Sequence, residues 1–250
     1  MGKPDIFDEI IGYLKEESGR VKYANVSECI LNDFFSDVEK KPGKSAAQAK
    51  PSPSTPFHPS GRKVSEMDLD ELRATVNNCT LCRLHESRTN TVFSDGDFKA
   101  KLMFIGEGPG RDEDEQGLPF VGRAGQLLTR MINAMQFERR EVYIANIVKC
   151  RPPDNRNPEQ DEAELCIPYL KRQIELVNPE VIVLLGAVPL RYILGKVGIT
   201  KLHGVWHEYN GIKVMPTLHP AYLLRNPPAK KDAWEDLQKV MKVFGKVHKK

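Results

Sequence analysis

Four of the five cysteines in this chain form two pairs whose spacing is typical of metal ligands. Two residues separate Cys79 from Cys82, and 15 residues separate Cys150 from Cys166. Two pairs of thiolates that are distant in sequence suit either a tetrahedral zinc ion or a four-iron cluster. The spacing matches neither bacterial nor plant-type ferredoxins, so the cysteines alone do not identify the metal. The alternative to a metal site is four buried free thiols with a structural role only. We expect Cys29 to be an unrelated free thiol.

Two glycine-rich segments have the composition of ligand-binding loops. Residues 106–110, Gly-Glu-Gly-Pro-Gly, follow an apolar run, and glycine lets a backbone approach a ligand with its N–H groups exposed. A dinucleotide-binding fingerprint would need a glycine at the position of Arg111. These glycines therefore do not identify a ligand, and a tight turn without a ligand is the alternative. Residues 117–125 place Phe120 before an amphipathic helix, where its ring can face a flat ligand instead of the core.

Two further polar residues, in or directly after apolar runs, are candidates for ligand binding or catalysis. His219 follows an apolar run and precedes Pro220, which places it better for function than the other five histidines, although a lone histidine is more often structural. Asn146 lies inside the apolar run 144–148, where a buried amide needs hydrogen-bond partners or is kept for a ligand.

The elements that position these residues follow from apolar patterning. We expect strands at 102–105, 142–148, 181–185 and 213–218, and helices at 124–135, 159–177, 188–194 and 233–244. A capping box formed by Ser65 and Asp68 predicts a further short helix through Val76. Apolar strands that alternate with helices indicate a three-layer α/β/α fold around a mainly parallel, four-stranded sheet. Ligands of such sheets bind beyond the carboxyl ends of the strands, where the unusual residues lie.

Composition divides the chain into three zones. Residues 1–40 contain nine acidic and five basic residues and the spacing of a short amphipathic helix. Residues 41–65 contain five prolines, five serines, five bases and no acid, which is linker composition. The segment 42–45 ends like a phosphate-binding loop, but the first glycine that this motif requires is replaced by Val38. We expect residues 66–250 to form the domain that contains the residues described above.

Charge and hydropathy exclude several classes of protein. The 250 residues carry 37 basic and 34 acidic side chains, 40% are hydrophobic and 28% are charged, which is the composition of an ordinary globular protein. Apolar runs are too short to span a bilayer, and the first residues do not resemble a signal peptide, so we expect a cytoplasmic protein with no membrane contact. The net charge of +3 does not by itself indicate whether the protein binds nucleic acid.

Taken together, these residues resemble the iron–sulfur, family 4 (type-4) uracil-DNA glycosylases of bacteria and archaea. The resemblance covers about residues 66–245 and rests on four motifs in order. These are GEGPG at 106–110, GLPFVGRAG at 117–125, NIVKCRPPDNR at 146–156 and HPAYLL at 219–224. The 1–65 extension carries no part of it.

The resemblance implies a cofactor and a way of reading the base. A [4Fe-4S] cluster with a structural role would be held by Cys79, Cys82, Cys150 and Cys166. Uracil would be flipped out of the DNA, stacked on Phe120 and read by Asn146, which would accept from N3–H and donate to O4. Cytosine presents the opposite pattern at both atoms, so it would leave buried polar groups unpaired. Glu113 matches the residue thought to crowd C5 and exclude the methyl group of thymine.

The resemblance also implies the reaction. His219 would donate to uracil O2 as the base leaves as an anion, supported by backbone N–H groups near Glu107 and Gly108. No lysine fits a Schiff-base role, so we expect a monofunctional enzyme that leaves an abasic site in base excision repair. Gly108 stands where some glycosylases have a water-positioning aspartate, and Glu107 and Asn155 are weaker candidates for that task.

We expect DNA contact from a turn after the last strand and from nearby bases. Apolar residues of the turn would wedge into the gap left by the flipped base, and cations would neutralise phosphates. The residues concerned are Tyr222, Leu223, Leu224 and Arg225, with Arg151, Arg156, Lys230 and Lys231. We also expect a monomer, and the 1–40 segment is a candidate contact for a repair or replication protein.

Two rival readings stay open on the sequence. A cross-linking relative carries a histidine-containing basic insertion, whereas residues 151–158 here contain no histidine. A non-catalytic, metal-stabilised DNA-binding module or polymerase accessory would bind DNA without excising a base. That reading leaves the joint occurrence of Phe120, Asn146 and His219 unexplained.

Overall fold

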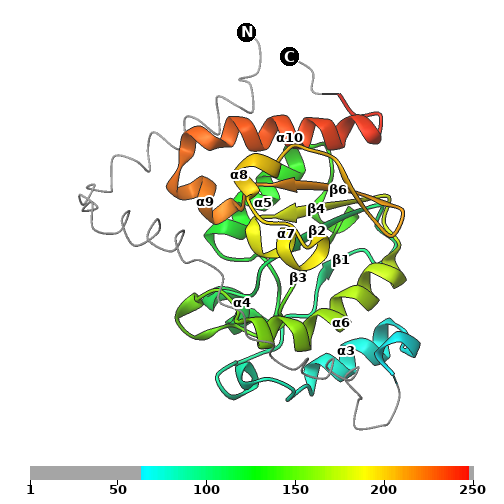
Figure 1. Ribbon diagram of the computed structural model, residues 1–250, viewed down its shortest axis with the longest axis vertical. Coiled ribbons are helices and arrows are strands. Elements are labelled where there is room, and N and C mark those ends of the chain that lie inside the picture. The colour runs from blue at the N-terminus through cyan, green and yellow to red at the C-terminus, as the bar shows by residue number, and fades with distance from the viewer. Residues whose placement is uncertain (1–62, 248–250) are drawn as a thin grey trace, which may run out of the picture. The chain divides into compact units, whose positions relative to one another are not determined.

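The computed structural model describes residues 63–247, which lie in the compact unit that spans residues 55–250. The predicted helix within 1–40 and nearly all of the predicted linker 41–65 fall outside the described residues, so both stay predictions. Figure 1 shows a central sheet with helices packed around it. Among the described residues, no helix has the length and apolar character needed to cross a membrane.

The sheet has six strands in the order β1-β3-β2-β4-β6-β5. Its four inner strands are parallel, as predicted, and the two edge strands are antiparallel to their neighbours. The strands are β1 Asp95–Gly96, β2 Leu102–Gly106, β3 Tyr143–Asn146, β4 Val181–Leu185, β5 His207–Tyr209 and β6 Ile212–Thr217. The prediction of four strands is therefore wrong at the edges. Strands β1 and β5 are short and contain no buried residue, so neither produces the apolar run by which the inner strands are recognised.

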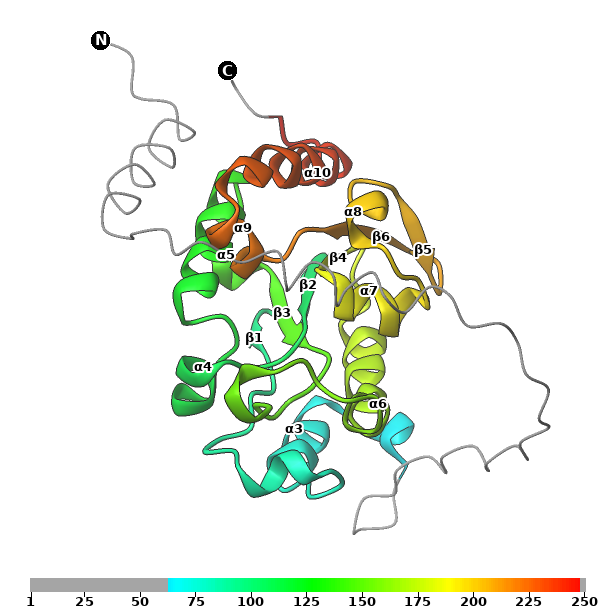
Figure 2. The same ribbon diagram turned by 60° about the vertical axis from the view of Figure 1, so that its left-hand side comes forward.

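Helices cover both faces of the sheet, which confirms the three-layer architecture (Figure 2). The helices are α3 Leu69–Asn77, α4 Arg111–Gln116, α5 Arg123–Ala134, α6 Gln160–Val177, α7 Ala187–Leu194, α8 Ile199–Leu202, α9 Pro220–Arg225 and α10 Lys230–Val243. The four long helices predicted for the domain occur as α5, α6, α7 and α10, within three residues of the expected ends.

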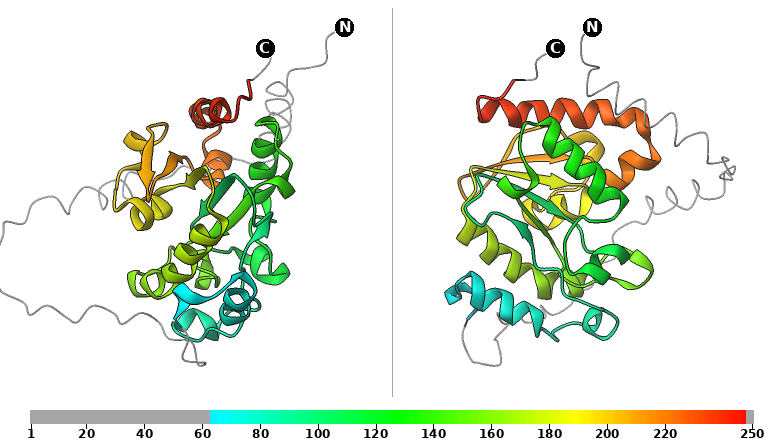
Figure 3. Two further views of the ribbon diagram at one scale, coloured as in Figure 1. Left: turned by 90° about the vertical axis from the view of Figure 1, so that its right-hand side faces the viewer. Right: turned by 180° about the vertical axis from the view of Figure 1, so that it is seen from behind.

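Side-chain alternation along the strands sends consecutive residues into two separate cores. On β2, Met103 and Ile105 pack with α3 and α6, whereas Leu102 and Phe104 pack with α5 and α10. Figure 3 shows the two helical layers with the sheet between them. Every residue of β2, β3 and β4 is buried, so these strands form a rigid platform for whatever follows their carboxyl ends.

Two local predictions need correction. Helix α3 is capped by Asp68, whose side chain accepts from the Glu71 amide while the Glu71 side chain accepts from the Asp68 amide. Ser65 lies in a preceding 3-10 turn, so the capping box starts three residues later than expected. Strand β3 ends at Asn146 and not at Val148, which places Asn146 at the carboxyl edge of the sheet.

Candidate functional site

The predicted site residues converge at the carboxyl edge of the parallel strands. Gly106 ends β2 and pairs directly with Asn146, the last residue of β3. His219 follows β6 by two residues and is the N-cap of α9. Because all these strands run in the same direction, their final residues meet at one edge of the sheet, as expected for this class of fold.

Asn146 and His219 line one open pocket. It also contains parts of the glycine-rich loop, the segment before α5, the loop after Cys150 and the start of α9. The lining residues are Glu107, Gly108, Pro109, Gly110, Glu113, Phe120, Ala124, Asn146, Pro152, Asn155, Arg156, Asn157, His219, Ala221, Tyr222 and Arg225. All seven residues predicted to act on the base or the sugar are therefore in the same place.

Gly106 is a glycine because two functional side chains press against its Cα. A Cβ atom there would lie 2.5 Å from Asn146 Oδ1 and 2.5 Å from Phe120 Cζ, well inside van der Waals contact. A side chain at this position would push the amide or the aromatic ring out of place. The absence of a side chain at Gly106 therefore leaves room for both Asn146 and Phe120.

The amide of Asn146 is buried and incompletely bonded. The residue is 1% exposed, and among the described residues no donor contacts its Oδ1 atom. A buried acceptor without a donor costs free energy, so this atom favours a ligand that brings an N–H group.

Phe120 and His219 approach each other although 98 residues separate them in the sequence. Their ring centroids are 5.9 Å apart, and the ring planes are inclined by 35°. Phe120 is 6% exposed and has a left-handed backbone conformation, with φ of 52°, which non-glycine residues seldom adopt. Such strain persists only when surrounding contacts hold it, and it is often found at binding sites.

The imidazole of His219 is neutral. Burial, together with the nearby positive charge of Arg225, lowers its pKa to about 4. Its Nδ1 atom accepts from the backbone N–H of Ala221 at 3.1 Å, so the single ring proton resides on Nε2. The residue can therefore present an N–H donor while carrying no charge itself.

The carboxyl group of Glu107 is affected by the same environment. Burial raises its pKa to about 6, because desolvation disfavours the charged form. A carboxyl group that titrates near neutrality in a pocket is a candidate for acid–base or charge-stabilising work.

Glu113 uses its carboxylate mainly to bind backbone. Its Oε1 atom accepts from the amides of Val121 and Gly122, each at 2.9 Å, and its Oε2 atom accepts from the amide of Gly110 at 3.1 Å. These contacts join the glycine-rich loop to the Phe120 segment. Its predicted contact with C5 of the base stays a prediction.

The predicted DNA-contacting turn is only partly available at the surface. Tyr222 and Arg225 are exposed and Leu224 is half-buried, but Leu223 is 1% exposed and packs in the core against α5 and α10. A helical turn such as α9 must bury one face, so Leu223 does not reach a DNA gap in this conformation. Lys230 Nζ, another expected phosphate ligand, is also buried.

The two arginines after Cys150 differ in what they contact. Arg151 Nε donates to Asn155 Oδ1 at 2.8 Å, so this pair is bonded internally on an exposed loop. Arg156 donates to both carboxylate oxygens of Glu162, at 2.8 and 2.7 Å, and Glu162 has a fully buried side chain. The predicted phosphate contact of Arg156 stays untested, and its main partner here is a carboxylate.

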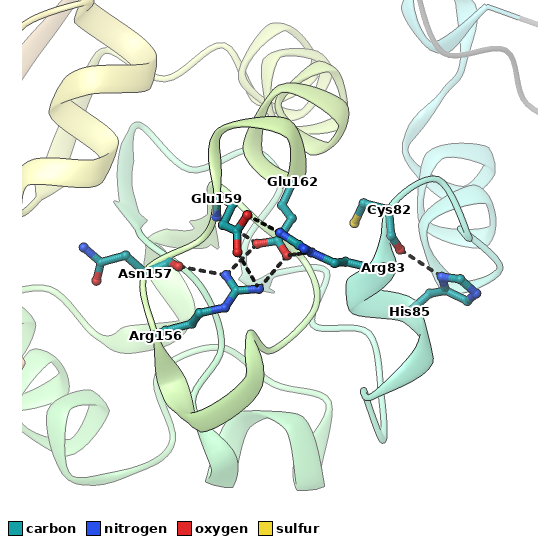
Figure 4. A network of polar contacts seen from close by, with 7 residues as sticks. All are labelled: Cys82, Arg83, His85, Arg156, Asn157, Glu159 and Glu162. Atoms are coloured by element: carbon teal, nitrogen blue, oxygen red, sulfur yellow. Dashed lines mark hydrogen bonds and ion pairs between the residues drawn. The ribbon is translucent and has the colours of Figure 1, made fainter.

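Glu162 is the centre of the polar network shown in Figure 4. Arg83 Nε contacts the same carboxylate at 2.9 Å, and Arg83 also pairs with Glu159. These hydrogen bonds lower the pKa of Glu162 to about 2. Since Arg83 follows Cys82 and Arg156 lines the pocket, the network ties the cysteine loop to one wall of the site.

The four paired cysteines line one pocket of their own, as the spacing predicts. Arg88 donates to Cys150 Sγ at 3.2 Å, and the Tyr169 hydroxyl donates to Cys79 Sγ at 3.5 Å. Burial raises the pKa of the Cys166 thiol to about 12, so it needs bound metal to be a thiolate at neutral pH. Among the described residues, no three His, Cys, Asp or Glu side chains are arranged around a single ion. Four thiols in one pocket, with an N–H and an O–H group that donate to two of the sulfur atoms, fit the ligand set of an iron–sulfur cluster.

Sequence reasoning missed the residues that support the site from behind. Arg139 contacts Asp95, Pro119, Phe120 and Thr129, and Glu162 joins Arg83 to Arg156. Most of these partners are ten or more residues apart, so no local spacing announces them. Glu162 stands with Asp161 in the first turn of α6, where acidic residues are common, so its position gave no sign of this role.

Comparisons with known proteins agree with this geometry. A family model described as the uracil DNA glycosylase superfamily matches residues 93–238. The type-4 uracil-DNA glycosylase of Sulfurisphaera tokodaii is 47% identical over 182 residues, which cover 69% of this chain and 83% of that protein. The type-4 enzyme of Thermotoga maritima is 50% identical over 154 residues, or 60% and 80% of the two chains. That of Saccharolobus solfataricus is 46% identical over 183 residues, or 69% and 85%.

Proposed function

The chain belongs to the uracil-DNA glycosylase superfamily, and on that premise we propose that it excises uracil from DNA by hydrolysing the N-glycosidic bond. The product is an abasic site, and uracil-containing DNA is the substrate. The observation that carries the proposal is the buried, unpaired Oδ1 atom of Asn146 in a pocket shared with Phe120 and His219.

Asn146 reads the base. Its Oδ1 atom accepts from uracil N3–H, and its amide nitrogen donates to O4. Cytosine has an acceptor at N3 and a donor at C4, so it would place an acceptor against Oδ1 and a donor against the amide nitrogen of Asn146. A site that leaves its own buried polar groups unpaired rejects the wrong base strongly.

Phe120 binds the face of the flipped base. A uracil inside the DNA stack is out of reach, and extrusion costs a few kcal/mol. Stacking on an aromatic ring offsets about 1–3 kcal/mol of that cost. Glu113, which holds the backbone beside the ring, limits the space at C5 in this proposal.

His219 stabilises the leaving group. The neutral ring directs its Nε2–H towards O2 of the departing uracil, where negative charge develops as the bond to the sugar breaks. A preoriented donor in a desolvated pocket stabilises such charge without reorganising. Backbone N–H groups at Glu107 and Gly108 support the same edge of the base.

Water attacks the sugar from the side of the glycine-rich loop. Gly108 has no carboxylate to hold it, so catalysis depends mainly on stabilising the leaving anion and the cationic sugar. Above pH 6 Glu107 is ionised and assists through its negative charge, and Asn155 is the weaker candidate. No lysine lines the pocket, which supports a monofunctional enzyme.

DNA is held around the mouth of the pocket. Tyr222 and Arg225 of α9 are exposed there, with Leu224 beside them, and they are the proposed contacts with the gap and the nearby phosphates. Arg151 contributes a further cation on the loop after Cys150. Arg156 supports this loop through Glu162 and adds its positive charge to the mouth.

A [4Fe-4S] cluster would be held by Cys79, Cys82, Cys150 and Cys166. When bound, it supplies a structural cross-link between the segment before β1, the loop after β3 and helix α6. Arg88 compensates negative charge on Cys150 and also donates to the carbonyl of Cys79 at 2.8 Å. We propose that this cross-link holds the pocket wall in place.

The test is excision from a labelled oligonucleotide with a single uracil, followed by alkali to cut abasic sites. Oligonucleotides with thymine or cytosine at the same position are the controls. We expect uracil-specific cleavage that Asn146→Ala abolishes and that Asn133→Ala, an exposed change on α5, retains. Binding without cleavage by protein with a full metal site would refute the proposal and leave the DNA-binding module.

A further inference from the structure

Arg139 bonds to several segments that surround the pocket, and it does not line the pocket itself. It begins the 3-10 turn Arg139–Glu141, just before β3. Its side chain is 23% exposed and makes four hydrogen bonds to other segments. The acceptors are the carbonyl oxygens of Pro119 at 2.6 Å and Phe120 at 3.1 Å, Thr129 Oγ1 at 3.0 Å and Asp95 Oδ2 at 2.8 Å.

Two of these acceptors belong to the strained part of the chain. Phe120 has a φ of 52°, which a residue with a Cβ atom adopts only under constraint. The chain then folds tightly onto the start of α5, where a Cβ atom at Gly125 would lie 1.9 Å from the carbonyl carbon of Phe120. Without an external restraint, this peptide would relax towards the commoner conformations and carry the ring with it.

The restraint acts from two sides. Arg139 holds the carbonyl groups of Pro119 and Phe120, and Glu113 holds the next two N–H groups, those of Val121 and Gly122. A cation thus binds the oxygens and an anion binds the hydrogens of consecutive peptide groups. Charged partners make such hydrogen bonds short and strong.

We propose that Arg139 is a positioning residue, which holds Phe120 in its strained conformation so that the ring is in place before the base arrives. The inference rests on the proposed stacking of uracil on Phe120. The guanidinium of Arg139 is needed for these contacts, because the single ammonium group of a lysine cannot contact four acceptors in different directions. Asp95, whose carboxylate fixes the Nε end of the fork, orients the guanidinium.

The experiment compares steady-state excision by wild-type protein and by Arg139→Lys, Arg139→Ala and Phe120→Ala. Stacking contributes to ground state and transition state alike, so its loss raises KM and leaves kcat nearly unchanged. We expect Phe120→Ala and Arg139→Ala each to raise KM about tenfold, with Arg139→Lys restoring only part of the loss. Asp95→Asn, which leaves the arginine in place, should raise KM about twofold.

The decisive measurement is the double variant. If Arg139 acts through Phe120, adding Arg139→Lys to Phe120→Ala should change KM by less than about twofold. Arg140→Ala is the matched control, because its side chain is 82% exposed and pairs only with Glu138 among the contacts described. Thermal unfolding of every variant shows whether assays run on folded protein, and Arg139→Lys and Asp95→Asn replace Arg139→Ala if it fails to fold.

Two outcomes would overturn the inference. If Arg139→Lys lowered kcat and the melting temperature with KM unchanged, the residue would be structural only. If its effect on KM persisted in the Phe120→Ala background, it would act by another route. Either result leaves the proposed function intact, whereas a wild-type protein that does not excise uracil removes the function itself.

Discussion

The rings of Phe120 and His219 lie 5.9 Å apart, although 98 residues separate them in the chain. One comes from the segment before α5 and the other from the end of β6, and both meet the amide of Asn146 at the carboxyl edge of the sheet. The aromatic face can stack on a base while the neutral imidazole donates to its edge. Arg139 holds the backbone carbonyl group of Phe120, and the backbone N–H of Ala221 holds the imidazole of His219, so these supports can be tested apart from the site.

Gly106→Ala tests the close approach at the end of β2. The added methyl group would lie 2.5 Å from Asn146 Oδ1 and from Phe120 Cζ, so one of them must move. We expect kcat/KM on uracil DNA to fall about 100-fold, because both base recognition and stacking are disturbed. Ile105→Val, a buried truncation on the same strand, is the control and should lose about 1 kcal/mol of stability with kcat/KM retained. Equal activities of Gly106→Ala and wild type would contradict the geometry.

The pH dependence of excision should reflect Glu107. Its pKa is raised to about 6 by burial, so the carboxyl group is neutral below that pH and ionised above it. If the ionised form assists the cationic sugar, kcat/KM rises with pH to a plateau above about 6. His219, with a pKa of about 4, is neutral throughout and adds no inflection between pH 5 and 8. Glu107→Gln should lower the plateau and remove the inflection, whereas Glu208→Gln on β5 should leave the profile unchanged.

The same shift predicts a change in stability. A carboxyl group whose pKa is raised in the folded state contributes stability below its unfolded pKa, and this contribution is lost as the pH rises through about 6. Glu107→Gln keeps the neutral form at all pH values. Its melting temperature relative to wild type should therefore be higher at pH 8 than at pH 4.5. A difference that does not vary with pH would show that burial does not control this group.

Glu162→Gln tests the network between the cysteine loop and the pocket wall. Removing the buried charge leaves Arg83 and Arg156 with only the half-exposed Glu159 as a shared anionic partner, which should lower the free energy of unfolding by about 2 kcal/mol at pH 7. The pKa of Glu162 is lowered to about 2, so this stabilisation is present above about pH 4.5 and fades as the pH falls towards 2. Urea unfolding across that range measures the decline.

The control for that experiment is Glu180→Gln. Glu180 pairs with Lys101 at 2.8 Å on the surface, and both side chains are more than half exposed. An exposed pair contributes less than about 1 kcal/mol, so its loss should be small at every pH. Equal costs for the two variants would show that the buried carboxylate has no special structural role.

Cys166→Ser tests the metal site separately from the reaction. We expect the iron content to fall from about four atoms per chain, together with the visible absorbance of the cluster and the melting temperature. Cys29→Ser is the matched control and should retain all three. A colourless wild-type protein that contains zinc would refute the cluster and leave the four-cysteine pocket as a zinc site.

Local sequence was sufficient to find the inner strands, the long helices and seven residues that line one pocket. The inner strands are mostly apolar because both faces of the sheet are covered, and their shared direction brings Gly106, Asn146 and His219 together at the carboxyl edge. The paired cysteines likewise predicted a shared pocket from their spacing. Each of these inferences depends on neighbours in the chain or on the parallel arrangement of strands.

The tertiary structure alone decided which side chains support the site and which reach the surface. Arg139 contacts Phe120 from 19 residues away and Asp95 from 44, and Glu162 meets Arg83 from 79 residues away. Leu223 belongs to the right turn but points into the core, which only the packing of α9 against α5 determines. Hydrogen bonds and burial of this kind depend on three-dimensional neighbours, and the periodicity and local spacing of a sequence carry no record of them.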